Sequence, residues 1–231
     1  GYHAGAVRIV CHNHIPQARG MGSSAEAIVA AVSAAYALSH DSIQRDEIFA
    51  LAASYEGHPD NVAPAVYGGF TISWFENVFH TVNYEVSREL QASIFIPDFE
   101  LSTEQARRAL PKTVAYSDAL YNLSRSALLP AALRPEIAAS SAKKSELLFV
   151  ATQDALHQPY RKSLMPLSWA LVEGLRKQGI AAAISGAGPC VIALYFGDMP
   201  IMDMARQAGM GEHWRALHVP INNTGVQIEV Q

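Results

Sequence analysis

The chain has 231 residues, of which half are hydrophobic and 16% are charged, with a formal net charge of −4. This length suffices for one large domain or two modest ones, and the composition excludes a disordered protein. The slightly negative net charge argues against a nucleic-acid partner, because nucleic-acid-binding proteins usually carry a basic patch. Polar residues interrupt every apolar run before it is long enough to span a bilayer, so we expect no membrane partner.

The first half of the chain mixes segments of helical and strand period. Apolar side chains at helical spacing predict helices, whereas alternation or short apolar runs predict strands. Over 78–86, one face collects Val78, His80, Val82, Tyr84 and Val86, which is typical of a half-buried strand. In chain order, we expect a strand at 6–12, helices at 23–38 and 46–55, and strands at 70–75, 78–86 and 91–97.

The second half of the chain predicts mainly helices. Ser102 and Gln105 form a capping box at the start of a helix that stops before Pro111. Further helices are expected at 118–133, 146–157 and 166–178. In the last of these, four apolar residues are predicted to share one buried face: Leu167, Ala170, Leu171 and Leu175.

The order of these elements predicts the fold class. Two apolar strands, AAAI at 181–184 and VIALYF at 191–196, flank the glycine-rich turn SGAGP. Strands and helices are mixed along the chain, which predicts an α+β protein. The polar stretch SREL at 87–90 is the expected boundary between a first domain, residues 1–88, and a second, residues 89–231.

The stretch IPQARGMGSSAEAIVAAV, residues 15–32, places glycines and serines directly before a predicted helix. Gly20 and Gly22 allow a tight backbone, and the free amides at a helix start attract anions, of which phosphate is the usual one. Ser23 and Ser24 add hydroxyls for a phosphate or a metal ion. The alternative is an ordinary helix entry with a serine cap.

Two other stretches carry candidate chemistry. EGHPDN, residues 56–61, gathers Glu56, His58, Asp60 and Asn61 in a predicted loop, where polar clusters serve sites more often than cores. The turn SGAGP, residues 185–189, is either a second ligand-binding loop or a plain hairpin connection. The segment CHNH, with Cys11, His12 and His14, fits no standard zinc spacing, and the two cysteines of the chain favour reduced thiols in a cytoplasmic protein.

Several stretches together resemble one family, the GHMP kinases. PQARGMGSSAEA, residues 16–27, is similar to that family's phosphate-loop motif P-x-x-x-G-L-G-S-S-A-x-A, and AAISGAGPCVIAL, residues 182–194, to its C-terminal glycine motif. Within the family, homoserine kinases are resembled most closely, through EGHPDNVAPAVYGG (56–69), ARRALP (106–111) and LHQPYR (156–161). The resemblance implies a two-domain fold, with an N-terminal part like domain 2 of ribosomal protein S5 and a ferredoxin-like C-terminal domain.

The resemblance also implies an activity, the phosphorylation of the side-chain hydroxyl of L-homoserine by ATP with Mg²⁺. Ser24 and Glu56 would hold the metal ion, since Mg²⁺ prefers oxygen ligands. The residues implied for nucleotide binding are Pro16, Arg19, Gly20, Met21, Gly22, Ser23, Ser24, Gly186 and Gly188.

The resemblance places the second substrate on five residues. Asp60 and Asn61 would face the reacting hydroxyl, either with Asp60 as base or with Asn61 orienting a hydroxyl that passes its proton to the phosphate. His58 would contact substrate or brace its loop. Arg107 and Arg161 would grip the carboxylate, because a guanidinium pairs with both carboxylate oxygens, although neighbouring Arg108 could take the place of Arg107.

Departures from the family pattern leave other readings open. Met21 replaces a usual leucine, Glu26 a small residue, and Cys190 a usual threonine or serine. Nothing matches the family's asparagine-bearing N-terminal segment, so either the full protein is longer, as we expect, or it has lost this family element. Two alternatives remain: a kinase that acts on another alcohol, such as mevalonate, and a relative that binds nucleotide without catalysis. The resemblance also implies a homodimer.

Overall fold

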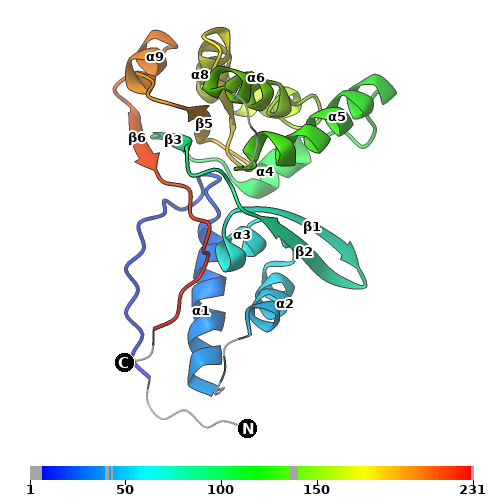
Figure 1. Ribbon diagram of the computed structural model, residues 1–231, viewed down its shortest axis with the longest axis vertical. Coiled ribbons are helices and arrows are strands. Elements are labelled where there is room, and N and C mark those ends of the chain that lie inside the picture. The colour runs from blue at the N-terminus through cyan, green and yellow to red at the C-terminus, as the bar shows by residue number, and fades with distance from the viewer. Residues whose placement is uncertain (1–6, 40–41, 43, 136–139, 230–231) are drawn as a thin grey trace. The chain divides into compact units, whose positions relative to one another are not determined.

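The computed structural model in Figure 1 describes residues 7–39, 42, 44–135 and 140–229. The chain divides into two compact units, and each of them collects segments that are distant in sequence. The first unit comprises Gly1–Gln17, Gly22–Glu85 and Asn222–Gln231, and the second comprises Ala18–Met21 and Val86–Ile221. The loop at 18–24 is therefore divided between them at the Met21–Gly22 peptide bond.

Three helices build the core of the first unit. They are α1 (Ser23–Ser39), α2 (Arg45–Glu56) and α3 (Val62–Tyr67), and α1 packs against both of the others. Alanines at their contacts, including Ala25, Ala52 and Ala63, are fully buried, and their small side chains allow the helices to approach closely. The predicted helices at 23–38 and 46–55 are confirmed.

A hairpin of β1 (Phe70–Glu76) and β2 (Val78–Tyr84) follows these helices. Both strands were expected, but the prediction that the even-numbered side chains of β2 form a half-buried face is wrong. Val78 is 60% exposed and Val82 is 41% exposed. The alternation shows which side chains share a face of a strand, and it carries no information about whether another element covers that face.

The last described residues return to the first unit. Gly69 N donates to Asn222 O over 2.8 Å, and Val226 N donates to Val66 O over 3.2 Å. The side chains of Val226 and Ile228 pack against the three-helix core. The first unit is thus completed by the C-terminal segment 222–229, for which no element was predicted, although Val226 and Ile228 alternate with polar residues.

A four-stranded antiparallel sheet forms the centre of the second unit. Its order is β4–β5–β3–β6, with β3 (Leu90–Pro97) pairing on one side with β5 (Val191–Phe196) and on the other with β6 (Trp214–Val219). The edge strand β4 (Ala181–Ile184) pairs antiparallel with β5, and both of these strands were predicted. The mixed α+β class expected from the sequence is confirmed.

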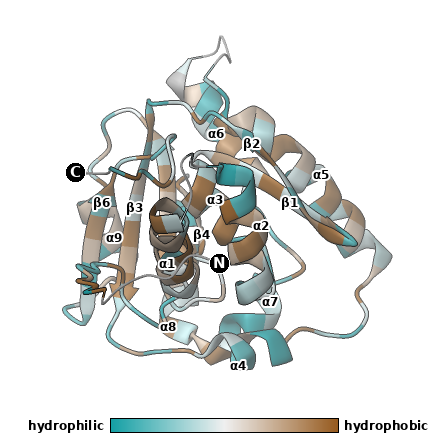
Figure 2. Ribbon diagram, turned by 90° about the horizontal axis from the view of Figure 1, so that it is seen from below, coloured by the Kyte–Doolittle hydropathy of each residue, from teal (hydrophilic) through white to brown (hydrophobic). Residues whose placement is uncertain are grey.

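Helices of the second unit pack against this sheet, among them α8 (Pro166–Lys177), which contacts β4 and β5. Leu171, Val172 and Leu175 of α8 join Phe95 and Val191 of the sheet in one buried cluster. Ser102 caps α4 by accepting a bond from Gln105 N at 3.1 Å, as the capping box predicts, and Figure 2 shows that α4 is mostly hydrophilic. The helical segments are α4 (Thr103–Arg108), α5 (Tyr116–Leu133), α6 (Ser141–Ala151), α7 (Gln158–Arg161), the 3₁₀ turn η1 (Lys162–Leu164), α8 (Pro166–Lys177) and α9 (Ile201–Gln207).

Three local predictions for these segments are corrected. Residues 7–12 of the expected strand at 6–12 form no strand, and Val7, Ile9 and Val10 are exposed; residue 6 lies outside the described residues. The helix expected at 146–157 ends at Ala151, where the chain turns toward α7. In α8, Leu167 and Ala170 of the predicted apolar face are exposed, whereas Ser168 is buried and its hydroxyl donates to Pro189 O in the turn before β5.

Candidate active site

The first part of the glycine-serine loop lies against the second glycine-rich turn within the second unit. Gly20 has a φ of 72°, and a Cβ built on it would lie 2.2 Å from the Ser185 carbonyl oxygen. The Ser185 hydroxyl donates to Gly20 O over 2.9 Å, and Cys190 N donates to Arg19 O over 3.3 Å. Of the glycine-serine stretch 20–24, which was predicted to share a site with 185–189, Gly20 therefore touches that turn.

The turn at 185–189 is itself tightly closed. Ser185 N donates to Cys190 O over 2.8 Å, and Gly188 N donates to Ser185 O over 2.9 Å. Gly188 has a φ of 88°, which favours glycine, and a Cβ there would lie 2.6 Å from the sulfur of the flexible Met165 side chain. Burial raises the pKa of the Cys190 thiol to about 11, which keeps it protonated and inert.

We expect Gly20→Ala to destabilise the protein by roughly 3 kcal/mol, because it adds a backbone clash to an unfavourable φ. Gly57→Ala is the matched control: Gly57 has a similar φ of 81°, but a Cβ there meets nothing within 4 Å. It should cost about 1 kcal/mol. Denaturant unfolding measures both, and equal losses would contradict the close approach of the two loops.

Arg19 anchors the loop to the end of β3. Its guanidinium donates to the carbonyl oxygens of Pro97, of Phe99 at 2.9 Å and of Asp98 at 3.3 Å. These bonds use three of the five N–H donors of the guanidinium and hold the side chain against the end of β3. The main chain of Arg19 stays beside the turn, since its carbonyl accepts from Cys190 N.

The second part of the loop begins α1 in the first unit. The first helical bond runs from Glu26 N to Gly22 O at 3.0 Å, so the amides of Ser23 and Ser24 precede it and lack an intrahelical acceptor. These amides stand at the positive end of a 17-residue helix. A Cβ on Gly22 would lie 3.3 Å from Asn61 Oδ1, so Asn61 lies beside the helix start.

A chain of polar contacts leads from this helix start through the EGHPDN loop. The Ser24 hydroxyl donates to Glu56 Oε2 over 2.8 Å, and Glu56 Oε1 lies 3.9 Å from His58 Nε2. His58 Nδ1 lies 2.7 Å from Asp60 Oδ1, which also accepts from Asn61 N at 3.0 Å. The structure thus brings together all the residues predicted for metal and hydroxyl binding in this unit.

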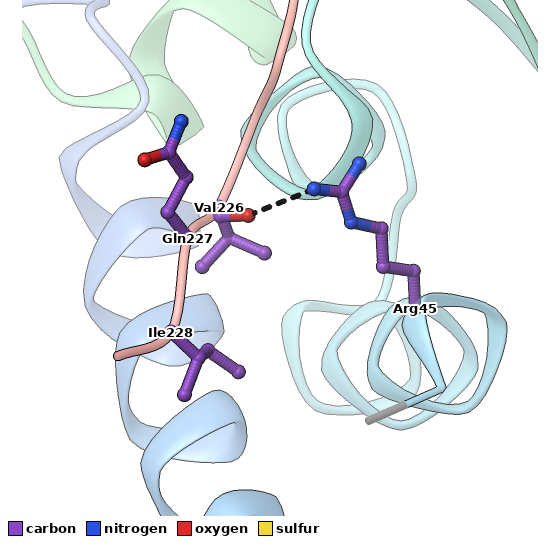
Figure 3. Close-up of a pocket in the computed structure, with 4 residues that line it drawn as sticks. All are labelled: Arg45, Val226, Gln227 and Ile228. Atoms are coloured by element: carbon purple, nitrogen blue, oxygen red, sulfur yellow. Dashed lines mark hydrogen bonds between the residues drawn. The ribbon is translucent and has the colours of Figure 1, made fainter. Parts of the chain in front are cut away.

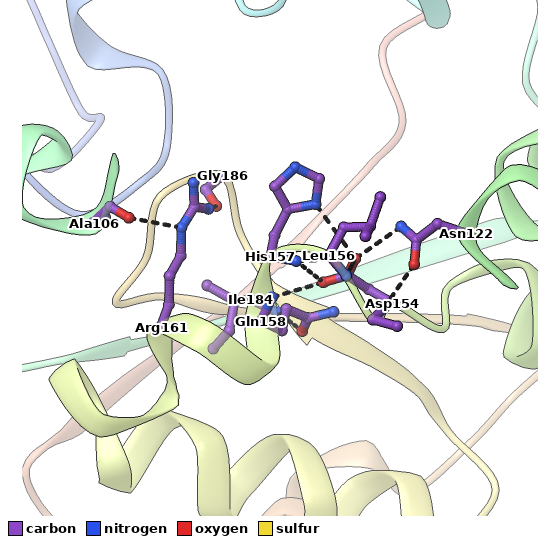
Figure 4. A network of polar contacts seen from close by, with 10 residues as sticks. Ala106, Asn122, Asp154, Leu156, His157, Gln158, Arg161, Ile184 and Gly186 are labelled. Carbon is purple, nitrogen blue, oxygen red and sulfur yellow. Dashed lines mark hydrogen bonds and ion pairs between the residues drawn. The ribbon is translucent and has the colours of Figure 1, made fainter. Parts of the chain in front are cut away.

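Arg161 stands at the end of α7 in the second unit. Its Nε donates to Ala106 O over 3.1 Å and its Nη1 to Gly186 O over 3.2 Å, which places it beside the glycine-rich turn (Figure 4). Burial lowers the pKa of Arg161, the charge of Asp154 raises it, and the positive charge of Arg107 lowers it again. The bond to Ala106 O, in the residue directly before Arg107, brings Arg161 close to Arg107 in this unit.

Arg108 differs from Arg107 in its contacts. It forms an ion pair with Glu104 one helical turn earlier on α4, and its side chain is 75% exposed. This geometry favours Arg107 over Arg108 as the partner of Arg161.

A network that the sequence analysis missed holds the helix carrying Arg161 (Figure 4). Asp154 accepts bonds from Leu156 N at 2.9 Å, His157 N at 3.0 Å and Gln158 N at 2.6 Å, and from the Asn122 amide at 2.9 Å. Burial alone would raise the pKa of Asp154, but these bonds and that with the His157 ring outweigh it and hold the pKa below its usual range. The motif LHQPYR pointed to a functional role for residues 156–161, but the sequence does not show which residues hydrogen-bond to them.

Other features of the described residues lie apart from these contacts. No group of three or more His, Cys, Asp or Glu side chains there could hold a metal ion. A hollow in the first unit is lined by Arg45, Val226, Gln227 and Ile228, none of which is a predicted site residue (Figure 3). Within the same described ranges, every helix falls short of the length and apolar character needed to cross a membrane.

Comparison with known families defines the class of this protein. Residues 1–69 match the model of the GHMP kinases N terminal domain, and residues 133–209 match that of the GHMP kinases C terminal domain. The fold is also that of mevalonate kinase from L. major, with a TM-score of 0.57 at 15% identity. The class is therefore that of the GHMP kinases, and the resemblance inferred from the motifs is confirmed.

Individual relatives narrow the assignment. Homoserine kinase of Corynebacterium kroppenstedtii is 40% identical over 92% of this chain and 68% of its own length, and that of Streptomyces avermitilis is 42% identical over 96% and 70%. The crystal structure of homoserine kinase from Cytophaga hutchinsonii matches with a TM-score of 0.77 at 25% identity, over 92% of this chain and 69% of that one. The chain belongs to the homoserine kinase family, and it spans about two thirds of the length of these relatives.

Proposed function

We propose that the protein transfers the γ-phosphoryl group of ATP to the side-chain hydroxyl of L-homoserine, giving O-phospho-L-homoserine and ADP. The new bond joins the substrate oxygen to phosphorus, and the bond that breaks releases ADP. One observation carries this proposal: Arg161 donates to Gly186 O in the turn whose Ser185 contacts Gly20. A cation suited to an amino-acid carboxylate thus adjoins two glycine-rich stretches suited to phosphate.

The phosphate-binding role falls to backbone amides. Those of Ser23 and Ser24 point out of the start of α1, where the helix dipole favours an anion. Gly20 and Gly186 leave the backbone of the two stretches bare of side chains. Pro16, Met21, Gly22 and Gly188 are proposed as supporting members of the nucleotide site, as is the main chain of Arg19.

Ser24 and Glu56 are the proposed magnesium ligands. Their oxygens lie 2.8 Å apart, and a hydroxyl with a carboxylate is a donor set that fits a hard cation which keeps several waters. When bound, Mg²⁺ would supply charge neutralisation for phosphoryl transfer. The protein contributes the fixed positions of these two oxygens.

The carboxylate of the substrate is assigned to Arg107 and Arg161. Two neighbouring guanidinium groups repel each other, and a bound carboxylate would relieve that repulsion while accepting paired hydrogen bonds. The family resemblance assigns Arg161 through LHQPYR and Arg107 through ARRALP. The position of Arg161 beside the glycine-rich turn supports binding of a substrate that carries an α-carboxylate.

The reacting hydroxyl is assigned to Asp60 and Asn61, with His58 nearby. His58 lies 2.7 Å from Asp60, so we propose that it orients this carboxylate and thereby braces the loop. Phosphoryl transfer depends mainly on positioning and charge stabilisation, so Asp60 could act as base or, alternatively, Asn61 could orient a hydroxyl whose proton passes to the phosphate.

Asp60→Asn separates these two routes. We expect kcat to fall by about 100-fold if Asp60 accepts the proton, and by less than about threefold if Asn61 orients the hydroxyl and the proton passes to the phosphate. The measurement is steady-state kcat at saturating ATP and homoserine. Asp98→Asn, at an exposed carboxylate of the second unit, is the matched control and should keep the full rate.

The experiment that tests the function is a coupled assay of ADP release with L-homoserine and, in parallel, with mevalonate. It is run on this chain and on a version extended at its N-terminus to the length of the relatives. Release of ADP with homoserine and not with mevalonate supports the proposal. Nucleotide binding without turnover on either alcohol, in the extended version, would favour a non-catalytic relative.

Three further expectations accompany this proposal. We propose that residues 1–88 act as the ATP-binding domain and residues 89–231 as the C-terminal domain; the compact units depart from these ranges at 18–21, 86–88 and 222–231. We also propose a cytoplasmic homodimer. Size-exclusion chromatography with light scattering tests the dimer.

A further inference from the structure

The helix that carries Arg161 is too short to hold its own conformation. α7 has four residues, Gln158–Arg161, and continues only into the 3₁₀ turn Lys162–Leu164, and so short a helical segment is unstable unless other groups restrain it. Asp154 supplies one restraint by accepting the amide of Gln158 at 2.6 Å, which satisfies a donor at the helix start. This bond fixes where α7 begins but does not tie it to the sheet.

Gln158 supplies the tie to the sheet. Its Oε1 accepts a bond from Ile184 N at 2.8 Å, and Ile184 is the last residue of β4. The next residues, Ser185 and Gly186, form the glycine-rich turn, and Gly186 O accepts from Arg161 Nη1 at 3.2 Å. α7 therefore bonds the end of β4 and the following turn at two points, one at each end of the helix (Figure 4).

The turn has several supports of its own, whereas α7 has few. Ser185 bonds Gly20 O and Cys190 O, and the Ser168 hydroxyl donates to Pro189 O over 2.6 Å. In the part of the chain that the structure describes, the side-chain hydrogen bonds from α7 to other elements come from Gln158 and Arg161. Loss of the Gln158 bond would accordingly loosen α7 more than the turn.

We infer that Gln158 is a positioning residue that sets the guanidinium of Arg161 relative to the glycine-rich turn. The inference rests on the proposed function, because it assigns the carboxylate of homoserine to Arg161. The side-chain oxygen of Gln158 accepts the Ile184 amide. Gln158 therefore affects substrate binding indirectly, by anchoring the helix that carries Arg161. A displacement of the binding group by a fraction of an ångström is enough to weaken substrate binding.

The test replaces the acceptor while keeping the size of the side chain. We expect Gln158→Met to raise the KM for homoserine about tenfold, to change the KM for ATP less than twofold and to lower kcat less than threefold. Hydrogen exchange of the Ile184 amide should become at least tenfold faster, because it loses its acceptor. If Gln158→Met does not fold, Gln158→Asn, whose side chain is one methylene too short, is expected to show the same pattern.

Gln178→Met is the matched control. Gln178 is a half-buried glutamine of the second unit whose amide donates to Gly174 O at 3.3 Å and Met204 O at 2.9 Å, away from α7. It should lower the melting temperature by a similar amount and leave both KM values unchanged. A Gln158 variant with faster Ile184 exchange and an unchanged KM for homoserine would overturn the inference, as would an equal rise in KM for Gln178→Met. If the unsubstituted protein does not phosphorylate homoserine, the proposed function fails as a separate result.

Discussion

Arg161→Ala is expected to raise the KM for homoserine roughly 30- to 100-fold and to change the KM for ATP by less than about threefold. The substitution removes paired, charge-assisted hydrogen bonds to the substrate carboxylate, each of which contributes about 1.5–3 kcal/mol. It also removes a bond to Gly186 O, but the turn keeps its links through Ser185. Steady-state kinetics with each substrate varied in turn measures the two KM values.

The control for this variant is Arg206→Ala, which removes an exposed arginine paired with Asp203 on α9. It should leave both KM values as they are. Arg107→Ala should resemble Arg161→Ala, whereas Arg108→Ala should have a small effect because Arg108 pairs with Glu104 at the surface. Equal losses for ATP and homoserine in Arg161→Ala would contradict its assignment to the carboxylate.

Ser24→Ala is expected to lower kcat/KM for ATP by about 100-fold at millimolar Mg²⁺. The hydroxyl of Ser24 lies 2.8 Å from the Glu56 carboxylate, and its loss would leave the metal ion with one protein ligand fewer. Because the defect lies in metal binding, raising the Mg²⁺ concentration should restore part of the rate. A titration of activity against Mg²⁺ measures this shift directly.

Ser54→Ala provides the comparison for Ser24→Ala. Ser54 is an exposed serine of α2 in the same unit, and its hydroxyl donates to Leu51 O over 2.7 Å within its own helix. Its replacement should leave the Mg²⁺ dependence unchanged. Full activity of Ser24→Ala at low Mg²⁺ would remove Ser24 from the metal site.

Much of the fold follows from local patterns in the sequence. Helical period located α1, α2, α5 and α8 to within a few residues, and Ser102 capped α4 as predicted. Local patterns failed where the outcome depended on distant partners. Val7 to Val10 have strand-like composition but no strand neighbour among the described residues, and Leu167 shares a helical face with Leu171 without being covered.

The candidate site was predictable to the extent that each residue sits in a contiguous motif. Polar and charged residues cluster within a few positions in each of three motifs: the glycine-serine loop, EGHPDN and LHQPYR. What the sequence could not provide is the bonding between motifs. The link from Gln158 to Ile184 spans 26 positions and that from Ser185 to Gly20 spans 165, and no period connects such pairs.

The return of residues 222–229 to the first unit has a practical consequence for anyone who wants to study that unit in isolation. An expression clone that stops at residue 85 would omit Val226 and Ile228 and expose the part of the three-helix core that their side chains cover. Joining residues 222–229 to the end of β2 through a short linker, or permuting the termini, would keep Val226 and Ile228 over the core. The isolated unit should then aggregate less.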